Sequence, residues 1–225
     1  MYSVYTRYAI ITAMSTPSDL RSRKRLATRQ GISNAATRLF LERGFDNVTV
    51  DEIAAAADVG RMTVFNHFPR KEDMFFDRDE EGREVLRNAL RQRDPQVTPI
   101  ETLRLLAHRL VKEQSPYVSF TIESQGFVET IERSETLKAR ARAIRNELWQ
   151  LVAEALCQSA EREADDPDAH LAAGLLLATW TVAIIQAHRV FRQRRDAAAA
   201  QVVFLAIVDK GTVGIQAAVA GTPYA

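Results

Sequence analysis

The chain has 225 residues, enough for one larger domain or two small ones. Its 46% hydrophobic and 26% charged residues are typical of a soluble globular protein, and 30 basic against 29 acidic side chains say nothing about partners. Cys157 is the only cysteine, which excludes an intrachain disulfide and a cysteine-based metal site. Because Arg7 interrupts the short apolar run near the N-terminus, we expect no export signal and a cytoplasmic protein, starting at Met1 or Met14.

Helical periodicity dominates the sequence and strand alternation is nearly absent, so we expect an all-α fold. Between residues 32 and 40, apolar side chains recur every three or four positions, which predicts an amphipathic first helix that ends at Gly44. Thr49 and Glu52 have the spacing of a capping box. They predict a second helix that begins at Val50 and runs to about Ala57.

A short turn at residues 58–60 leads to a third helix, which begins at Arg61 and ends near Phe68 because Pro69 disfavours a helical residue before it. Pro69 is expected to open a fourth helix that runs to about Arg93. Further helices are predicted at residues 99–114, 117–132, 135–160, 167–193 and 196–219.

The second and third helices, joined by a tight turn, have the form of a helix-turn-helix, in which the second helix of the pair enters the DNA major groove. Val64 and Phe68 are expected to face inward, against Leu39, Phe40 and Ile53. The outward face carries the candidate base-reading residues, which are Arg61, Met62, Phe65 and Asn66. Arginine can bridge guanine, asparagine can bridge adenine, and apolar side chains can meet the thymine methyl group.

An ordinary short helix with a solvated face is the alternative for this stretch, and three flanking features favour DNA binding. A basic cluster precedes the first helix and comprises Arg21, Arg23, Lys24, Arg25 and Arg29, of which Arg23, Lys24 and Arg25 form the candidate DNA-contacting arm. Arg70 and Lys71 follow the third helix, and the amides behind the Thr49 cap are suited to phosphate. Thr63 and His67, four residues apart, form an edge that is also suited to phosphate.

The segment ISNAATRLFLERGFDNVTVDEIAAAADVGRMTVFNHFPRKEDMF resembles the N-terminal domain of the TetR family of one-component transcriptional regulators, over about residues 24–75. The matching positions are Ala35, Ala36, Leu39, Phe40, Gly44, Phe45, Thr49, Val50, Ile53, Ala54, Val59, Thr63, His67, Phe68, Lys71 and Glu72. The resemblance implies that Thr49, Thr63, His67 and Lys71 contact phosphates and that Arg61 and Met62 approach bases. From its place after the third helix, Arg70 is a further candidate for phosphate contact.

Three positions depart from the family pattern. Asp58 stands where the family usually has glycine, and Gly60 stands where it often has a serine cap. Phe65 replaces the usual tyrosine, so we expect its ring to contact a sugar or a thymine methyl group rather than a phosphate.

Members of this family carry a C-terminal helical domain that binds a small effector and forms a dimer. We therefore expect a disordered tail over residues 1–20, a three-helix helix-turn-helix domain over 21–70, and a larger helical effector-binding and dimerisation domain over 71–225. Charge is nearly absent from residues 171–188 and 197–225. Helices that are apolar all round need burial on both faces, which favours a homodimer closed as a four-helix bundle over a single large monomer core.

The candidate effector-pocket residues are His108, Phe120, Phe127, Trp149 and Trp180. They suggest a moderately apolar effector but do not identify it. No cofactor is expected, and the histidines lack metal-ligand spacing, so no metal site is predicted. Polar side chains within residues 171–188 argue against a membrane span.

The sequence thus favours a sequence-specific DNA-binding regulator, a repressor that a small-molecule effector releases from an inverted-repeat operator. The fourth helix, as the only element expected to touch both domains, would act as the lever. An architectural or effector-binding helical protein that does not read DNA sequence is the alternative, and an enzyme is disfavoured because no catalytic motif is legible. The operator, its target genes, the effector and the direction of regulation are left open.

Overall fold

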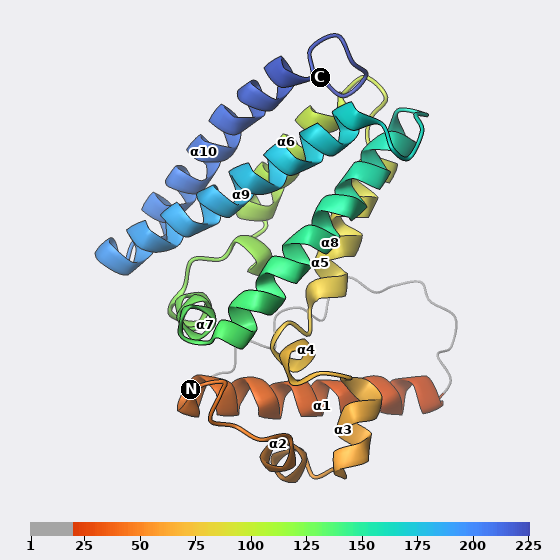
Figure 1. The fold of residues 1–225 in the computed structure, drawn as a ribbon. Helices are drawn as coiled ribbons and strands as arrows, with labels where there is room; N and C mark the ends of the chain where they lie inside the picture. The colour runs from red at the N-terminus through yellow and green to blue at the C-terminus, as the bar shows by residue number, and fades with distance from the viewer. Residues whose placement is uncertain (1–19) are drawn as a thin grey trace.

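The computed structural model describes residues 20–225, and within them every regular element is helical (Figure 1). The predicted tail and the choice between Met1 and Met14 lie outside the described residues, apart from Leu20, which opens α1. In chain order the elements are α1 (Leu20–Arg43), α2 (Val50–Ala56), α3 (Arg61–His67), α4 (Lys71–Phe75), α5 (Asp79–Arg91), α6 (Pro99–Lys112), the 3₁₀ helix η2 (Pro116–Val118), α7 (Ile122–Arg133), α8 (Glu135–Ser159), α9 (Pro167–Arg194) and α10 (Ala197–Ala218).

The first core lies between α1, α2, α3 and α4, at the bottom of Figure 1. Val64 of α3 and Phe68, which caps its C-terminal end, are fully buried, and they share this core with Leu39, Phe40 and Ile53. The prediction of which face of α3 points inward is therefore confirmed. Burial of that face leaves the opposite face of α3 on the surface of the molecule.

The capping box predicted for α2 is present. The Thr49 hydroxyl accepts a hydrogen bond from the Glu52 amide at 3.2 Å, and the Thr49 amide donates to the Glu52 carboxylate at 2.8 Å. Arg43 adds an ion pair to Glu52 at 2.7 Å. These contacts, led by the Thr49 amide, lower the pKa of Glu52 to about 2, because each of them favours the charged carboxylate.

The prediction of one fourth helix from Pro69 to about Arg93 is wrong. The segment forms two helices, α4 and α5, that are separated by a turn at residues 76–78. At this turn the Asp77 carboxylate accepts a hydrogen bond from the Ser33 hydroxyl of α1, and burial raises the pKa of Asp77. Because Phe75 and Phe76 both pack into the first core, tertiary contacts outweigh the helical periodicity here.

The prediction of a helix over residues 117–132 is wrong at its start. A 3₁₀ turn occupies Pro116–Val118, and α7 begins only at Ile122. The Thr121 hydroxyl caps α7 by accepting a hydrogen bond from the Ser124 amide, while the Thr121 amide donates to the Ser124 hydroxyl. Serine at this position replaces the glutamate or glutamine of the usual box, so the sequence pattern did not show the cap.

The second core lies between α5, α6, α8, α9 and α10. α9 and α10 form an antiparallel hairpin that packs on α8 and α6 (Figure 1). By length and composition alone, both hairpin helices are apolar enough to cross a membrane. Each has a buried stripe in the core and an exposed apolar stripe on the opposite side, so the two-sided apolar character predicted from sequence is confirmed.

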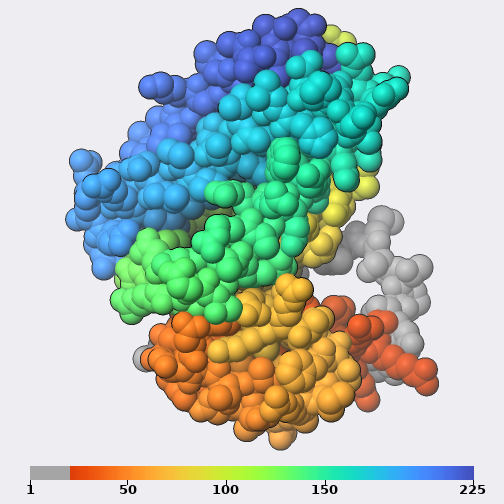
Figure 2. All heavy atoms as spheres, viewed as in Figure 1, coloured from red at the N-terminus to blue at the C-terminus, as the bar shows by residue number. Residues whose placement is uncertain are grey.

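The two cores form two lobes that meet along α4, α7 and the N-terminal end of α8 (Figure 2). Leu137 of α8 is fully buried in the first core, and Phe127 of α7 stacks on Phe75 of α4 at 4.4 Å between ring centroids. Ser134 also donates to the Asp46 carboxylate at 2.9 Å. The prediction that the fourth helix alone touches both domains is therefore wrong, because α7 and α8 contact the first lobe directly.

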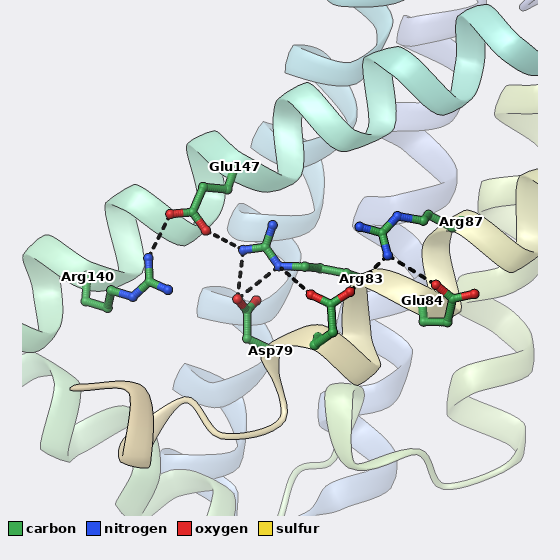
Figure 3. A network of polar contacts seen from close by, with 7 residues as sticks. Asp79, Arg83, Glu84, Arg87, Arg140 and Glu147 are labelled. Atoms are coloured by element: carbon green, nitrogen blue, oxygen red, sulfur yellow. Dashed lines mark hydrogen bonds and ion pairs between the residues drawn. The ribbon is translucent and has the colours of Figure 1, made fainter. Parts of the chain in front are cut away.

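A network of ion pairs extends this junction along α5 and α8 (Figure 3). Arg83 of α5 pairs with Asp79 at 2.7 Å and also with Glu147 of α8. Glu147 in turn pairs with Arg140 at 2.8 Å, and Arg140 lies 3.4 Å from Asp73 of α4. Charged groups thus connect the second lobe to α4, whose apolar side belongs to the first core.

Gly211 permits the close approach of α9 and α10, and its replacement is expected to destabilise the protein. A methyl group at position 211 would lie 2.2 Å from Cγ2 and 2.6 Å from Oγ1 of Thr179. We predict that Gly211→Ala lowers the free energy of unfolding by about 1–3 kcal/mol, because the helices must move apart. Gly31→Ala is the control, since nothing lies within 4 Å of a methyl group there. Chemical denaturation should show a loss for Gly211→Ala only, and equal midpoints for the two variants would contradict the packing argument.

The α2 capping box should make the first lobe sensitive to acid. Since the folded-state pKa of Glu52 lies below its ordinary value of 4.5, its contribution is complete above pH 4.5 and is lost as pH falls towards about 2. Glu52→Gln removes the titrating group but keeps an acceptor for the Thr49 amide. We predict that the difference in melting temperature between the unaltered protein and this variant is largest near neutral pH and shrinks below pH 4.5. A difference that stays constant from pH 7 to pH 3 would exclude this linkage.

Candidate nucleic-acid interface

The outward face of α3 carries the predicted base-reading residues. Arg61, Met62 and Asn66 are exposed, with Met62 at 71%, whereas Phe65 is half-buried. Thr63 and His67, at the edge of this face, are also half-buried. The solvent-exposed Met62, beside Arg61 and Asn66, suits a surface that contacts base edges.

The C-terminal end of α3 is held by Arg29 of α1, which the sequence had placed in the basic cluster. Its guanidinium donates a hydrogen bond to the backbone carbonyl of His67 and lies over the Phe68 ring, 3.9 Å from the centroid. A cation at this place also suits the negative end of the helix dipole. Arg29 therefore positions α3, a role that spacing alone did not reveal.

The N-terminal end of α3 carries Arg61, whose guanidinium is already engaged. Its Nη1 lies 2.7 Å from Oδ2 of Asp51, a residue of α2. The guanidinium carbon is 5.5 Å from the centroid of the Phe65 ring, one turn further along α3. Sequence reasoning missed Asp51, because nothing in the spacing of ten residues indicates that the two side chains meet.

Several predicted phosphate-binding residues make internal contacts in this structure. The Thr49 hydroxyl belongs to the capping box, and Lys71 donates to the carbonyl of Phe45, above whose ring it lies at 4.1 Å. Burial lowers the pKa of Lys71 and also that of His67, because it disfavours the charged form of each side chain. The phosphate roles of Thr49, Thr63, His67 and Lys71 stay predictions.

The remaining basic side chains lie on both sides of α3. Arg23, Lys24 and Arg25 are exposed near the start of α1, and Arg70 is exposed between α3 and α4. The C-terminal end of α3 packs on α1 through Arg29 and the first core. Exposed basic residues thus precede and follow α3 in the chain, and their contacts to DNA stay predictions.

The candidate effector-pocket residues do not gather at one place. Phe120 and Trp180 each lie near Phe204, at 6.1 and 6.2 Å between ring centroids, in the second core. Phe127 belongs instead to the junction of the two lobes. His108 and Trp149 line two separate open hollows, of about 650 and 510 Å³. Only Phe120 and Trp180 therefore remain together as a candidate set.

His108 has a partner that explains its place. Its Nε2 lies 2.7 Å from the Asp209 carboxylate of α10, which Arg104 also contacts at 3.0 Å. Trp149 donates to the backbone carbonyl of His170 at 2.9 Å. Both side chains thus help to join helices, whereas the buried Trp180 Nε1 lacks a hydrogen-bond partner among the described residues.

Comparison with known proteins bears mainly on the first lobe. The family model of bacterial regulatory proteins of the tetR family matches residues 32–77. The chain is 42% identical over 62 residues to the HTH-type transcriptional regulator TcmR of Streptomyces glaucescens, which covers 27% of each chain. It is 42% identical over 48 residues to the HTH-type transcriptional repressor DhaR of a Mycobacterium species, 21% of this chain and 24% of that one. The match spans about a quarter of the length of these curated relatives.

Solved structures show the same fold over most of the chain. The complex of SmeT with triclosan has a TM-score of 0.55 at 21% identity, covering 84% of this chain and 91% of that one. Thermus thermophilus FadR, a repressor bound to lauroyl-CoA, has a TM-score of 0.50 at 27% identity, covering 81% and 94%. The similarity to the tetR family of bacterial regulatory proteins is thus shown for residues 32–77, and the solved structures show the fold of the rest.

Proposed function

We propose that this protein is a sequence-specific DNA-binding transcriptional regulator. The observation that carries the proposal is α3, which buries Val64 and Phe68 and turns Arg61, Met62 and Asn66 outward, within the segment that matches the tetR family. Flanking basic residues supply the phosphate attraction that positions such a helix on DNA, while the outward side chains supply sequence discrimination. DNA as the partner implies action inside the cytoplasm.

The regulator acts as a homodimer through the exposed stripe of the α9–α10 hairpin. The large apolar side chains of this stripe are Leu171, Val182, Ile185, Val202 and Val213, between 46% and 67% exposed. Exposed apolar side chains on two adjacent helices fit a second copy of the same hairpin. Two-fold symmetry would place two α3 helices ~34–36 Å apart on an inverted-repeat operator.

A small molecule that binds the second lobe releases the DNA. The Phe120 and Trp180 cluster is the place we favour, because it is apolar and offers the unpartnered Trp180 Nε1. Movement there reaches α3 through α7 and α8, whose Phe127 and Leu137 pack against the first core. The SmeT and FadR structures hold triclosan and lauroyl-CoA, which supports an effector without identifying the one used here. Repression is the direction we favour, since DhaR, SmeT and FadR are repressors.

Substitutions of base-reading and phosphate-binding residues should have different effects on DNA affinity. A preferred duplex is first selected by the unaltered protein from a random pool. Arg61→Ala is expected to cost ~1–3 kcal/mol on that duplex and to relax preference at one base pair, because it removes a base contact. Lys24→Ala with Arg25→Ala should weaken binding to every duplex and reduce the salt slope by about two, because two phosphates lose their partners.

Fluorescence anisotropy over a range of salt concentrations, on the selected duplex and on a scrambled one, measures both effects. If Arg61→Ala weakened binding to both duplexes equally, Arg61 would not read a base. If the unaltered protein selected no sequence, the protein would be an architectural DNA-binding protein and not a sequence-specific regulator.

The dimer should dissociate when a charge enters the hairpin stripe. Ala183 is unsuitable as the site of that charge, because it is fully buried in the protomer core. Val213, at 67% exposed, is the better site. We expect Val213→Arg to convert the dimer to a monomer, because an unpaired guanidinium is costly to bury in an apolar interface.

Ile122→Arg is the matched control, since Ile122 is 70% exposed on α7 and lies outside the hairpin. Multi-angle light scattering should give the dimer mass for this control and half that mass for Val213→Arg. A dimer mass for both variants would move the interface away from the hairpin, and a monomeric unaltered protein would rule out the dimer.

A further inference from the structure

Arg61 and Asp51 form an ion pair across the helix-turn-helix, and it carries an inference that rests on the proposed function. We infer that Asp51 is a specificity-determining positioning residue, which holds the Arg61 guanidinium in the orientation that reads a base. Asp51 lies in the first turn of α2, and Arg61 is the first residue of α3. Their side chains meet at 2.7 Å between Oδ2 and Nη1.

The geometry leaves part of the guanidinium free for a base. An arginine presents five N–H donors in a planar fork, and Asp51 takes a hydrogen bond from Nη1 only. The ring of Phe65, 5.5 Å from the guanidinium carbon, lies on the same side of α3. The carboxylate and the ring together limit the directions in which the fork can point, and a bidentate contact to guanine needs a fixed direction.

A purely stabilising role explains this pair poorly. The side chains of Arg61 and Asp51 are 59% and 64% exposed, and ion pairs in water add little to folding stability. A carboxylate on a surface that approaches DNA also opposes phosphate binding. The pair restricts the rotamers of Arg61 before DNA binds. A pre-oriented arginine therefore loses less side-chain entropy on binding than a flexible one.

A negative charge near the base contact also acts against unproductive binding. On a duplex that offers no partner to Arg61, the pair gains no base contact, while the Asp51 carboxylate still repels the nearby phosphates. On the correct base pair, Arg61 engages both Asp51 and the base. Asp51 is therefore expected to raise the ratio of specific to random binding rather than the overall affinity.

Asp51→Ala tests this inference on the duplex selected by the unaltered protein and on a duplex changed at the base pair that Arg61→Ala identifies. We expect Asp51→Ala to lower the preference between the two duplexes about tenfold, which corresponds to about 1.4 kcal/mol. Binding to random duplex should be unchanged or stronger, since one negative charge is lost. Melting temperature should change little for so exposed a pair.

Asp58→Asn is the matched control, because it removes one negative charge from the turn between α2 and α3 without altering the pair. Asp58 has a φ of 53°, a conformation that asparagine tolerates. The control should strengthen random binding like Asp51→Ala but keep the preference of the unaltered protein. An equal loss of preference in both variants would show a general charge effect and overturn the inference.

A double substitution separates positioning from a structural effect on α2. In the Arg61→Ala background, Asp51→Ala should cause no further loss of preference, because the group that it orients is absent. A further loss there would show that Asp51 acts through something other than Arg61, and the inference would fail. If the unaltered protein selected no preferred duplex, the proposed function itself would be refuted. That outcome is distinct from a failure of the Asp51 inference, which requires a preferred duplex.

Discussion

A helix of seven residues has too few hydrogen bonds to persist in water, so α3 exists because Val64 and Phe68 are buried against α1. Arg29 adds a hydrogen bond to the last turn and a guanidinium over the Phe68 ring. The outward residues of α3 are defined by this burial, since a helix that is fixed on one face can present only the other. The proposed DNA contacts depend on that attachment.

The polar groups of the candidate interface are largely ordered before DNA arrives. The Thr49 hydroxyl is held by Glu52, and the Lys71 ammonium is held by the Phe45 carbonyl. Arg61 is held by Asp51. Such contacts reduce the rotamer entropy that binding would otherwise cost, although part of each group's hydrogen-bonding capacity is already used.

Side chains from the second lobe form part of the core of the first lobe. Leu137, from a helix of the second lobe, completes the core beneath α1, and the ring of Phe127 stacks on Phe75. A domain boundary at residue 70 stays a prediction, but the packing assigns α4 to the first core. The second lobe is therefore packed against α1 and α4 through α7 and α8, and α3 packs on α1 in turn.

Local patterns in the sequence were sufficient for the class of fold, the start of α2 at Val50, the bounds of α3 and its buried face. They succeeded because a capping box, a proline and apolar spacing act over a few residues. They failed where distant residues meet, at the break between α4 and α5 at Asp77 and in the dispersal of the five effector candidates. The late start of α7 was missed for a local reason, since its cap has serine where the usual box has glutamate or glutamine. The pairing of Arg61 with Asp51, and of Arg29 with α3, likewise required the tertiary structure, because long side chains find partners that sequence separation does not encode.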